Sequence, residues 1–141
     1  MLMRSRAKTK DTGVWIEGYY ACESNHACFA NEHKYTHFIF RDEFLDWSIG
    51  GLVQYEVIGQ TVGRSTGLFD KNLKEIFEGD ILEHHVQSDR IVNRGVVNWD
   101  KTNARWAFQL NTMNSSFSLF DREAWVVIGN IHDNPELIKG E

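Results

Sequence analysis

The residues best suited to metal chemistry lie in one short segment near the N-terminus. They are two cysteines and three histidines: Cys22, His26, Cys28, His33 and His37. Thiolates and imidazoles are the usual ligands of zinc, but a structural site normally shows two close ligand pairs, and the spacing here is Cys-x3-His-x-Cys. In an extended strand the two cysteines would lie about 20 Å apart, unless residues 23–25 formed a tight turn. We therefore expect two free thiols in a reducing cytosol, no metal and no cofactor.

The acidic residues do not form a recognisable calcium-binding or catalytic set. Asp70, Asn72 and Lys74 match the start of an EF-hand loop, but Glu75 replaces the glycine of the sixth position and Ile81 replaces the glutamate of the twelfth. The sequence also lacks the P-loop, dinucleotide-binding, zincin and nucleophile-elbow motifs. We therefore expect that the protein is not an enzyme, and an unrecognised enzyme is the least favoured hypothesis.

The best case for nucleic-acid binding is the segment from Arg90 to Trp106. Four of its residues are the candidate nucleic-acid or partner contacts: Arg94, Trp99, Lys101 and Arg105. Small β-barrels often bind single strands with cations that follow the phosphates and aromatic rings that stack on the bases. Alternation, however, places Trp106 on a core face with Phe108 and Leu110, so a solvated strand face is the competing interpretation of the cations.

Charge is distributed unevenly along the chain. The first ten residues carry four cations and no acid, whereas the remaining residues carry 11 basic and 20 acidic side chains. The four cations are Arg4, Arg6, Lys8 and Lys10. An acidic body repels phosphate at long range, and chain ends are commonly frayed. We therefore expect residues 1–10 to form a solvated basic arm that could touch nucleic acid only weakly.

Length and composition indicate one compact globular domain. The chain has 141 residues, of which 38 are Phe, Leu, Ile or Val, enough for a packed core, and one is proline. No apolar run approaches the roughly 18 residues of a membrane span. The basic start is followed by Asp11, Thr12 and Gly13 rather than by the apolar segment of a secretory signal. We expect no membrane partner and a cytoplasmic location.

The local pattern predicts a mainly β fold with about eight strands. Alternation in residues 105–110 and 116–119 predicts a hairpin around the turn-forming residues 111–115. Enrichment in β-branched and aromatic residues predicts six further strands, at residues 14–20, 35–40, 52–58, 81–86, 91–99 and 125–131. A turn or helical fragment is possible near residues 42–48. A short C-terminal helix is expected after Asn134, a suitable N-cap, with Pro135 at its first position.

Four segments carry a resemblance to a known family. The central ones are Thr61–Asn72 (TVGRSTGLFDKN) and Lys74–Ile81 (KEIFEGDI). The flanking ones are Gly13–Tyr20 (GVWIEGYY) and Val127–Leu137 (VIGNIHDNPEL). In type and order they resemble the YopX family, small proteins encoded by bacteriophages and prophages. Leu73 departs from the pattern, because many members have a glycine at this place in the turn.

The resemblance implies a mainly β fold of a single domain, reminiscent of small SH3-like barrels, and no established activity. A dense turn at residues 63–80 divides the chain into an N-terminal β region, residues 11–62, and an SH3-like-barrel-type C-terminal β region, residues 63–141. We expect structural roles for the signature turn residues Thr66, Gly67, Asp70, Glu78, Gly79 and Asp80. Asp80 stands where the chain enters a strand, a place where a short carboxylate accepts backbone hydrogen bonds well.

Two hypotheses about function lead. The favoured one is a non-enzymatic β module that binds a protein partner or a second copy of itself, because the chain is small, holds 18 aromatic residues and shows no catalytic set. The alternative is a nucleic-acid-binding accessory protein that uses the basic arm and the Arg90–Trp106 segment. Light scattering would detect self-association, and salt-dependent oligonucleotide binding would identify the alternative.

Overall fold

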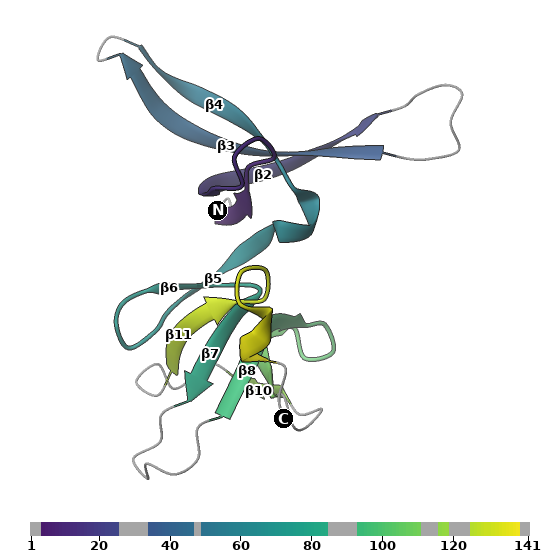
Figure 1. Ribbon diagram of the computed structural model, residues 1–141, viewed down its shortest axis with the longest axis vertical. Helices are drawn as coiled ribbons and strands as arrows, with labels where there is room; N and C mark the ends of the chain where they lie inside the picture. The colour runs from purple at the N-terminus through teal and green to yellow at the C-terminus, as the bar shows by residue number, and fades with distance from the viewer. Residues whose placement is uncertain are drawn as a thin grey trace. The chain divides into compact units, whose positions relative to one another are not determined.

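The computed structural model describes residues 4–25, 34–46, 49–84, 93–110, 116–118 and 125–138. Their backbone is mainly β-strand (Figure 1), which confirms the predicted fold class. The chain divides into two compact units, Met1–Arg64 and Ser65–Glu141. Within the described ranges, no helix is long and apolar enough to cross a membrane.

The N-terminal unit is built on an antiparallel sheet with the strand order β4-β3-β2-β1-β5. The strands are β1 (Arg4–Lys8), β2 (Trp15–Asn25), β3 (Lys34–Asp46), β4 (Ile49–Val57) and the start of β5 (Gly63–Phe69). A 3-10 turn, Gly59–Thr61, joins β4 to β5. The buried core on one face of the sheet consists of Ala7, Ile16, Ile39 and Val57, with Tyr55 and Val62 packed against it. These residues follow the two-residue period of strands, so the side chains between them lie on the opposite face.

The basic N-terminal segment is the inner strand β1, so the expectation of a solvated arm is wrong for residues 4–8. β1 pairs with β2 over its whole length and with the first residues of β5. The side chains alternate between a buried and a cationic set, Ser5, Ala7 and Thr9 against Arg4, Arg6 and Lys8. Because the inner positions hold small residues, the segment lacks the large apolar side chains that make alternation visible in a sequence.

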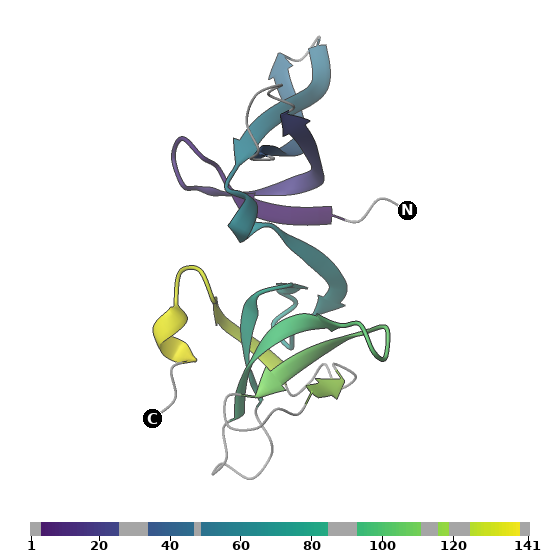
Figure 2. The ribbon, with the colours of Figure 1, turned by 90° about the vertical axis from the view of Figure 1, so that its right-hand side faces the viewer.

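The C-terminal unit contains the rest of β5, the short strand β6 (Glu75–Phe77) and a second antiparallel sheet. This sheet has the order β10-β9-β8-β7-β11. Its strands are β7 (Asp80–His84), β8 (Asn93–Asp100), β9 (Arg105–Leu110), β10 (Ser116–Ser118) and β11 (Trp125–Asn130). Figure 2 shows the green hairpin of β8 and β9 beside β7. The buried core consists of Ile76, Leu82, Val97, Phe108 and Trp125.

All eight predicted strands are present, and the described residues contain three more, β1, β5 and β6. β5 and β6 lie inside residues 63–80, which were expected to be a dense turn. The predicted hairpin of residues 105–110 and 116–119 is confirmed by the pairing of β9 with β10. Its expected turn, residues 111–115, lies outside the described residues.

Two expected helical segments differ from the structure. The fragment considered near residues 42–48 is wrong over its described part, because β3 continues to Asp46 and pairs with β4. The C-terminal helix is a single 3-10 turn, Pro135–Leu137, and the side chain of Asn134 makes no capping bond to it. The Asn134 Oδ1 atom instead accepts a hydrogen bond from the N–H of Asn130 at 3.4 Å. The Asn134 side chain therefore stabilises the end of β11 and does not cap a helix.

Candidate functional site

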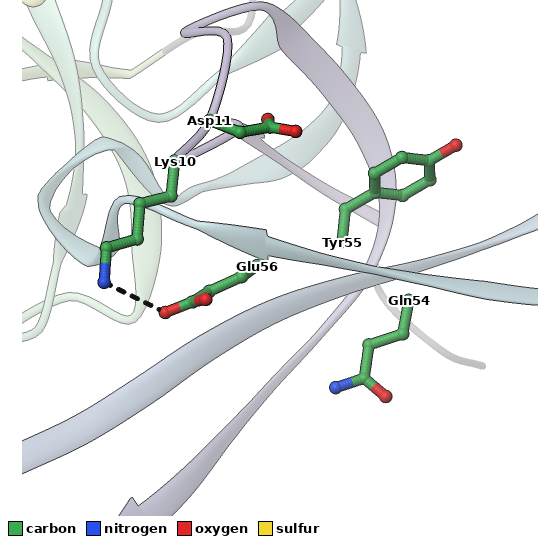
Figure 3. A pocket seen from close by; sticks show the side chains of 5 residues that line it. All are labelled: Lys10, Asp11, Gln54, Tyr55 and Glu56. Atoms are coloured by element: carbon green, nitrogen blue, oxygen red, sulfur yellow. Dashed lines mark hydrogen bonds and ion pairs between the residues drawn. The ribbon is translucent and has the colours of Figure 1, made fainter.

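An open pocket lies against strand β4 of the N-terminal unit. Its volume is about 310 Å³, and it is lined by Lys10, Asp11, Gln54, Tyr55 and Glu56 (Figure 3). Gln54, Tyr55 and Glu56 are consecutive in β4, and successive side chains of a strand point to opposite faces of the sheet. Both faces of β4 therefore contribute to the pocket wall. The other two come from the turn that joins β1 to β2. We call this site the β4 edge pocket.

The turn between β1 and β2 is held by its own backbone. The N–H of Thr9 donates to the carbonyl of Val14 at 2.9 Å, and the N–H of Gly13 donates to the carbonyl of Thr9 at 2.9 Å. Gly13 has a φ of 70°, in the left-handed region that glycine adopts without steric cost. This local closure fixes the two residues that the turn contributes to the pocket.

Two backbone hydrogen bonds attach this turn to β4. The N–H of Lys10 donates to the carbonyl of Glu56 at 3.0 Å, and the N–H of Ile58 donates to the carbonyl of Lys8 at 2.9 Å. The Nζ atom of Lys10 also lies 3.1 Å from the Oε1 atom of Glu56. Exposed ion pairs contribute only about 0–1 kcal/mol, so the backbone bonds are the firmer attachment.

Contacts from β3 hold Tyr55 in the pocket wall. Its hydroxyl donates a hydrogen bond to the Oε1 atom of Glu43 at 2.6 Å. The Nη2 atom of Arg41 lies 2.6 Å from the same oxygen, and its guanidinium carbon lies 5.7 Å from the centre of the Tyr55 ring. The hydrogen bond from Tyr55, followed by that from Arg41, lowers the pKa of Glu43. The same hydrogen bond raises the pKa of Tyr55 above its usual 10.0.

Replacing Glu43 with glutamine should lower the pKa of Tyr55 towards its usual value. The neutral amide accepts a weaker hydrogen bond and does not repel the tyrosinate. Since the folded pKa is raised, the contact contributes stability below the usual tyrosine pKa, and this contribution is lost as the pH rises through the folded pKa. Spectrophotometric titration of tyrosinate in Glu43→Gln, with Tyr55→Phe to identify the signal, measures the change. An unaltered Tyr55 titration in Glu43→Gln would contradict this assignment.

Two of the residues predicted as nucleic-acid or partner contacts, Arg94 and Trp99, lie on opposite faces of β8. Trp99 lies on the core side, where its ring meets that of Trp106 edge-on at a centroid distance of 5.2 Å. Arg94 is five positions away, on the opposite face, and its Nε atom lies 3.0 Å from the Oε2 atom of Glu83. The structure therefore does not bring Arg94 and Trp99 onto one surface.

The other two predicted contacts, Lys101 and Arg105, lie at the turn between β8 and β9, which Asp100 organises. The Asp100 carboxylate accepts hydrogen bonds from the Asn103 side chain at 2.8 Å and from the Thr102 N–H at 3.1 Å. Its Oδ2 atom lies 3.4 Å from the Nε atom of Arg105. These bonds, above all that of the Asn103 side chain, lower the pKa of Asp100. Arg94 and Arg105 thus each face a carboxylate, whereas Lys101 is exposed.

Asp70, one of the signature turn residues, accepts three backbone hydrogen bonds. Its side chain is 3% exposed and accepts hydrogen bonds from the N–H groups of Asn72 at 2.8 Å, Lys74 at 2.9 Å and Val127 at 3.0 Å. The carboxylate therefore closes a turn and ties it to β11. Leu73 in the same turn has a φ of 63°, in the left-handed region that favours glycine, the residue expected here from the family resemblance.

The other signature residues lie in β5 and at the connection from β6 to β7: Thr66, Gly67, Glu78, Gly79 and Asp80. The hydroxyl of Thr66 donates to a carbonyl of β6 at 2.7 Å. Gly67 and Gly79 have φ values of 74° and 89°, and Glu78 is half-buried. The Oδ2 atom of the buried Asp80 accepts a hydrogen bond from the N–H of Phe77 at 2.8 Å.

The residues considered for zinc are described only in part. Cys22 is paired directly with His37 across β2 and β3. Residues 23–25 continue β2, so they do not form the tight turn that shared ligation by the two cysteines would need. His26, Cys28 and His33 lie outside the described residues. In the described ranges, no group of three His, Cys, Asp or Glu side chains is placed to hold a metal ion.

Of the pocket residues, Lys10 alone is predicted from the sequence as a possible contact, as a cation of the basic arm, and the other four are not predicted as site residues. Lys10 and Glu56 are 46 positions apart, and they meet because the end of β4 returns past the end of β1. A local sequence motif does not reveal this contact, because the contact depends on the register of four strands. The nearest sequence signal is the strand pattern of residues 52–58, which predicts β4 but not its neighbour.

Comparison with known proteins places the chain in a family. The YopX protein family model matches residues 5–139. The crystal structure of protein EF1440 from Enterococcus faecalis is similar with a TM-score of 0.58 and 22% sequence identity, over 99% of this chain and 100% of that one. At this identity the likeness supports the fold. No curated protein matches the sequence. Because the family model spans nearly the whole chain, the protein belongs to the YopX family.

Proposed function

We propose that this YopX-family protein is a non-enzymatic β module that binds a protein partner through its N-terminal unit. The observation that carries the proposal is an apolar surface opposite the buried core of the sheet. It consists of Tyr19, Phe38, Phe40 and Leu52, and we call it the aromatic face. Tyr19 and Leu52 are 41% and 64% exposed. Contiguous exposed apolar side chains are typical of interaction surfaces, and tyrosine is common among residues that dominate binding.

The strand register supports the continuity of the aromatic face. Tyr19 of β2 is paired directly with Phe40 of β3, so their side chains lie on one face. Phe38 and Phe40 flank the fully buried Ile39 and point away from the core, with ring centroids 6.4 Å apart. On β4, Leu52 is paired with Asp42, which lies two positions beyond Phe40 on β3. The side chain of Leu52 therefore lies on the same face as that of Phe40 and diagonally across from it. Three adjacent strands therefore contribute to one surface.

A structural use of the buried carboxylates supports the non-enzymatic part of the proposal. Asp70 and Asp80 accept backbone hydrogen bonds that close turns and tie strands together. Acid–base chemistry instead needs carboxylates that are placed to meet a substrate. Their contacts give both aspartates a role in folding.

We extend the proposal to the architecture of the C-terminal unit and to the origin and location of the protein. The antiparallel order of β7 to β11 supports an SH3-like barrel in the C-terminal unit. Membership of the YopX family supports a phage or prophage origin and action in the cytoplasm of a bacterial host.

Changing Leu52 to serine tests the proposed function. Leu52→Ser should leave the melting temperature unaltered, because the side chain is 64% exposed, and should weaken binding to a partner captured by the native chain about tenfold. Leu73→Ser is the matched control, because this leucine is 81% exposed but lies in the C-terminal unit. Calorimetry with the purified partner gives the affinities. Equal affinities of the native chain and Leu52→Ser would count against the aromatic face.

Nucleic-acid binding is the second candidate, because β1 places cations beside this surface. Arg4, Arg6 and Lys8 share one strand face, and the Arg6 guanidinium and Lys8 ammonium lie 4.9 Å and 5.4 Å from the centre of the Trp15 ring. Cations next to aromatic rings suit single strands. If this candidate is correct, anisotropy of labelled single-stranded DNA or RNA will show binding that weakens steeply with salt and falls in Lys8→Ala, but not in Arg94→Ala. No binding at low salt excludes it.

A further inference from the structure

We propose that the outer edge of β4 binds an extended peptide by strand addition, and that the β4 edge pocket takes a lysine or arginine side chain of that peptide. This inference rests on the proposed function and specifies the partner segment. It uses the main chain at the outer edge of β4 and a pocket of the same unit, whereas the aromatic face is formed by side chains, and Leu52 belongs to both. Strand addition gives affinity through main-chain hydrogen bonds and specificity through side-chain pockets.

The backbone of β4 has groups directed to its outer edge. The bonds between Lys10 and Glu56 and between Ile58 and Lys8 show that the even-numbered residues at this end of β4 point away from β3. In an antiparallel strand this direction alternates with each residue. Leu52 and Gln54 therefore direct both N–H and carbonyl groups outward, while Val53, which lies between them, directs its backbone groups towards Arg41 of β3. In the described part of the chain, β3 is the one strand that runs beside β4.

The chain itself begins the ladder that a peptide would continue. The segment around Thr9 makes a single antiparallel bridge to Val57, at the end of β4. After Lys10 the chain leaves the edge in the turn that ends at Gly13, so the edge beside Leu52 and Gln54 is not covered by this segment. Unpaired edges of this kind are templates for a further strand. A peptide would lie in line with the bridged segment and end against the turn.

The net charge of the β4 edge pocket favours a cationic side chain of the peptide. The ammonium group of Lys10 is matched by the carboxylate of Glu56 at 3.1 Å. Asp11 is exposed and, among the described residues, forms no ion pair that would neutralise it, so the pocket has a net negative charge. Tyr55 adds an aromatic ring that Glu43 holds and that already lies 5.7 Å from the Arg41 guanidinium carbon, and an arginine or lysine side chain in the pocket would be a second cation beside this ring. Figure 3 shows Lys10 bound to Glu56, with Asp11 and Tyr55 on another side of the strand.

A defined peptide tests the proposal on the full chain. The probe is an acetylated heptapeptide of alternating threonine and valine with an arginine at its second position, the end that meets the turn, compared with versions that have glutamate or alanine at this position. Amide exchange followed by NMR should slow about tenfold at Leu52 and Gln54 on saturation and stay unaltered at Val53 and Tyr55. The arginine peptide should bind about fivefold more tightly than the glutamate peptide. Absence of protection at Leu52 and Gln54 would overturn the proposal without the need for any variant.

Two variants separate the edge from the pocket. Gln54→Pro removes an outward N–H and obstructs an added strand, but it keeps the bonds to β3, since proline is tolerated on edge strands. It should abolish peptide binding, whereas Gln54→Ser, the control, should retain it. Asp11→Asn should remove the preference for arginine and keep binding. Peptide binding that is unaltered in Gln54→Pro would overturn strand addition.

The outcome can be distinguished from failure of the proposed function. If Gln54→Pro still binds the captured partner while Leu52→Ser does not, the aromatic face is the binding surface and strand addition is overturned. If light scattering shows a dimer that Gln54→Pro converts to a monomer, the occupant of the edge is a second copy, which also overturns the peptide proposal. Loss of partner binding in both Gln54→Pro and Leu52→Ser supports both proposals.

Discussion

Asp70→Ala should destabilise the C-terminal unit by about 3–4 kcal/mol, because three backbone N–H groups lose a charged acceptor. Two of them, at Asn72 and Lys74, belong to the turn after β5, and the third, at Val127, belongs to β11, 57 positions away. The carboxylate is 3% exposed, so water cannot readily replace it. The substitution therefore opens a turn and also releases that turn from the sheet.

Asp70→Asn is the matched variant, since its amide keeps an oxygen acceptor but loses the charge and the second oxygen. It should cost about half as much as alanine, because hydrogen bonds to charged groups are about twice as strong as neutral ones. The free energy of unfolding from urea titrations measures both variants. A loss in Asp70→Ala smaller than about 1 kcal/mol, the usual scale of one neutral hydrogen bond, would contradict the assigned role.

Phe108→Ala should cost about 3–5 kcal/mol, the range of buried phenylalanine truncations. Phe108 is 1% exposed and packs in the core of the C-terminal unit, with its ring centroid 4.0 Å from that of Trp125 in an edge-to-face arrangement. Removing the ring leaves a cavity and deprives Trp125 of one of its two ring neighbours, while the His84 ring, 4.4 Å from that of Trp125, stays in place. The near-ultraviolet circular dichroism of the tryptophans should weaken together with the melting temperature.

Phe69→Ala is the control for this prediction, because Phe69 lies in the same unit but is 38% exposed. Its loss should cost less than about 1.5 kcal/mol, since partly exposed side chains have less transfer free energy to lose. Equal losses of stability in Phe69→Ala and Phe108→Ala would show that the core is placed wrongly.

The sequence predicts those strands whose inner positions hold large side chains. Trp106 and Phe108 alternate with smaller or polar residues, and their strand is predicted with its hairpin partner. β1 does not show this signal, because Ser5 and Ala7 are its buried residues while arginines and a lysine lie opposite. The same composition suggests a solvated arm when it is considered without its neighbours. The burial of small residues depends on two flanking strands, which local pattern cannot record.

The candidate site is less predictable than the fold, because it depends on register. Arg94 and Trp99 are close in sequence, yet they are five positions apart in a strand, and this odd offset places them on opposite faces. Arg94 meets Glu83 on a neighbouring strand, so a cation counted in the sequence is matched in the fold. Conversely, Lys10 and Glu56 are distant in sequence and line one pocket. The order of charges along the chain therefore predicts neither the pairing of Arg94 with Glu83 nor the β4 edge pocket.

Amide hydrogen exchange of the full chain, alone and with its captured partner, tests the central claim that the N-terminal unit is a protein-binding surface. Binding should slow exchange in β3 and β4, where the aromatic face and the outer edge meet, and should leave β7 to β9 of the C-terminal unit unaltered. Protection confined to the C-terminal unit, with exchange in β3 and β4 unaltered, would contradict the claim.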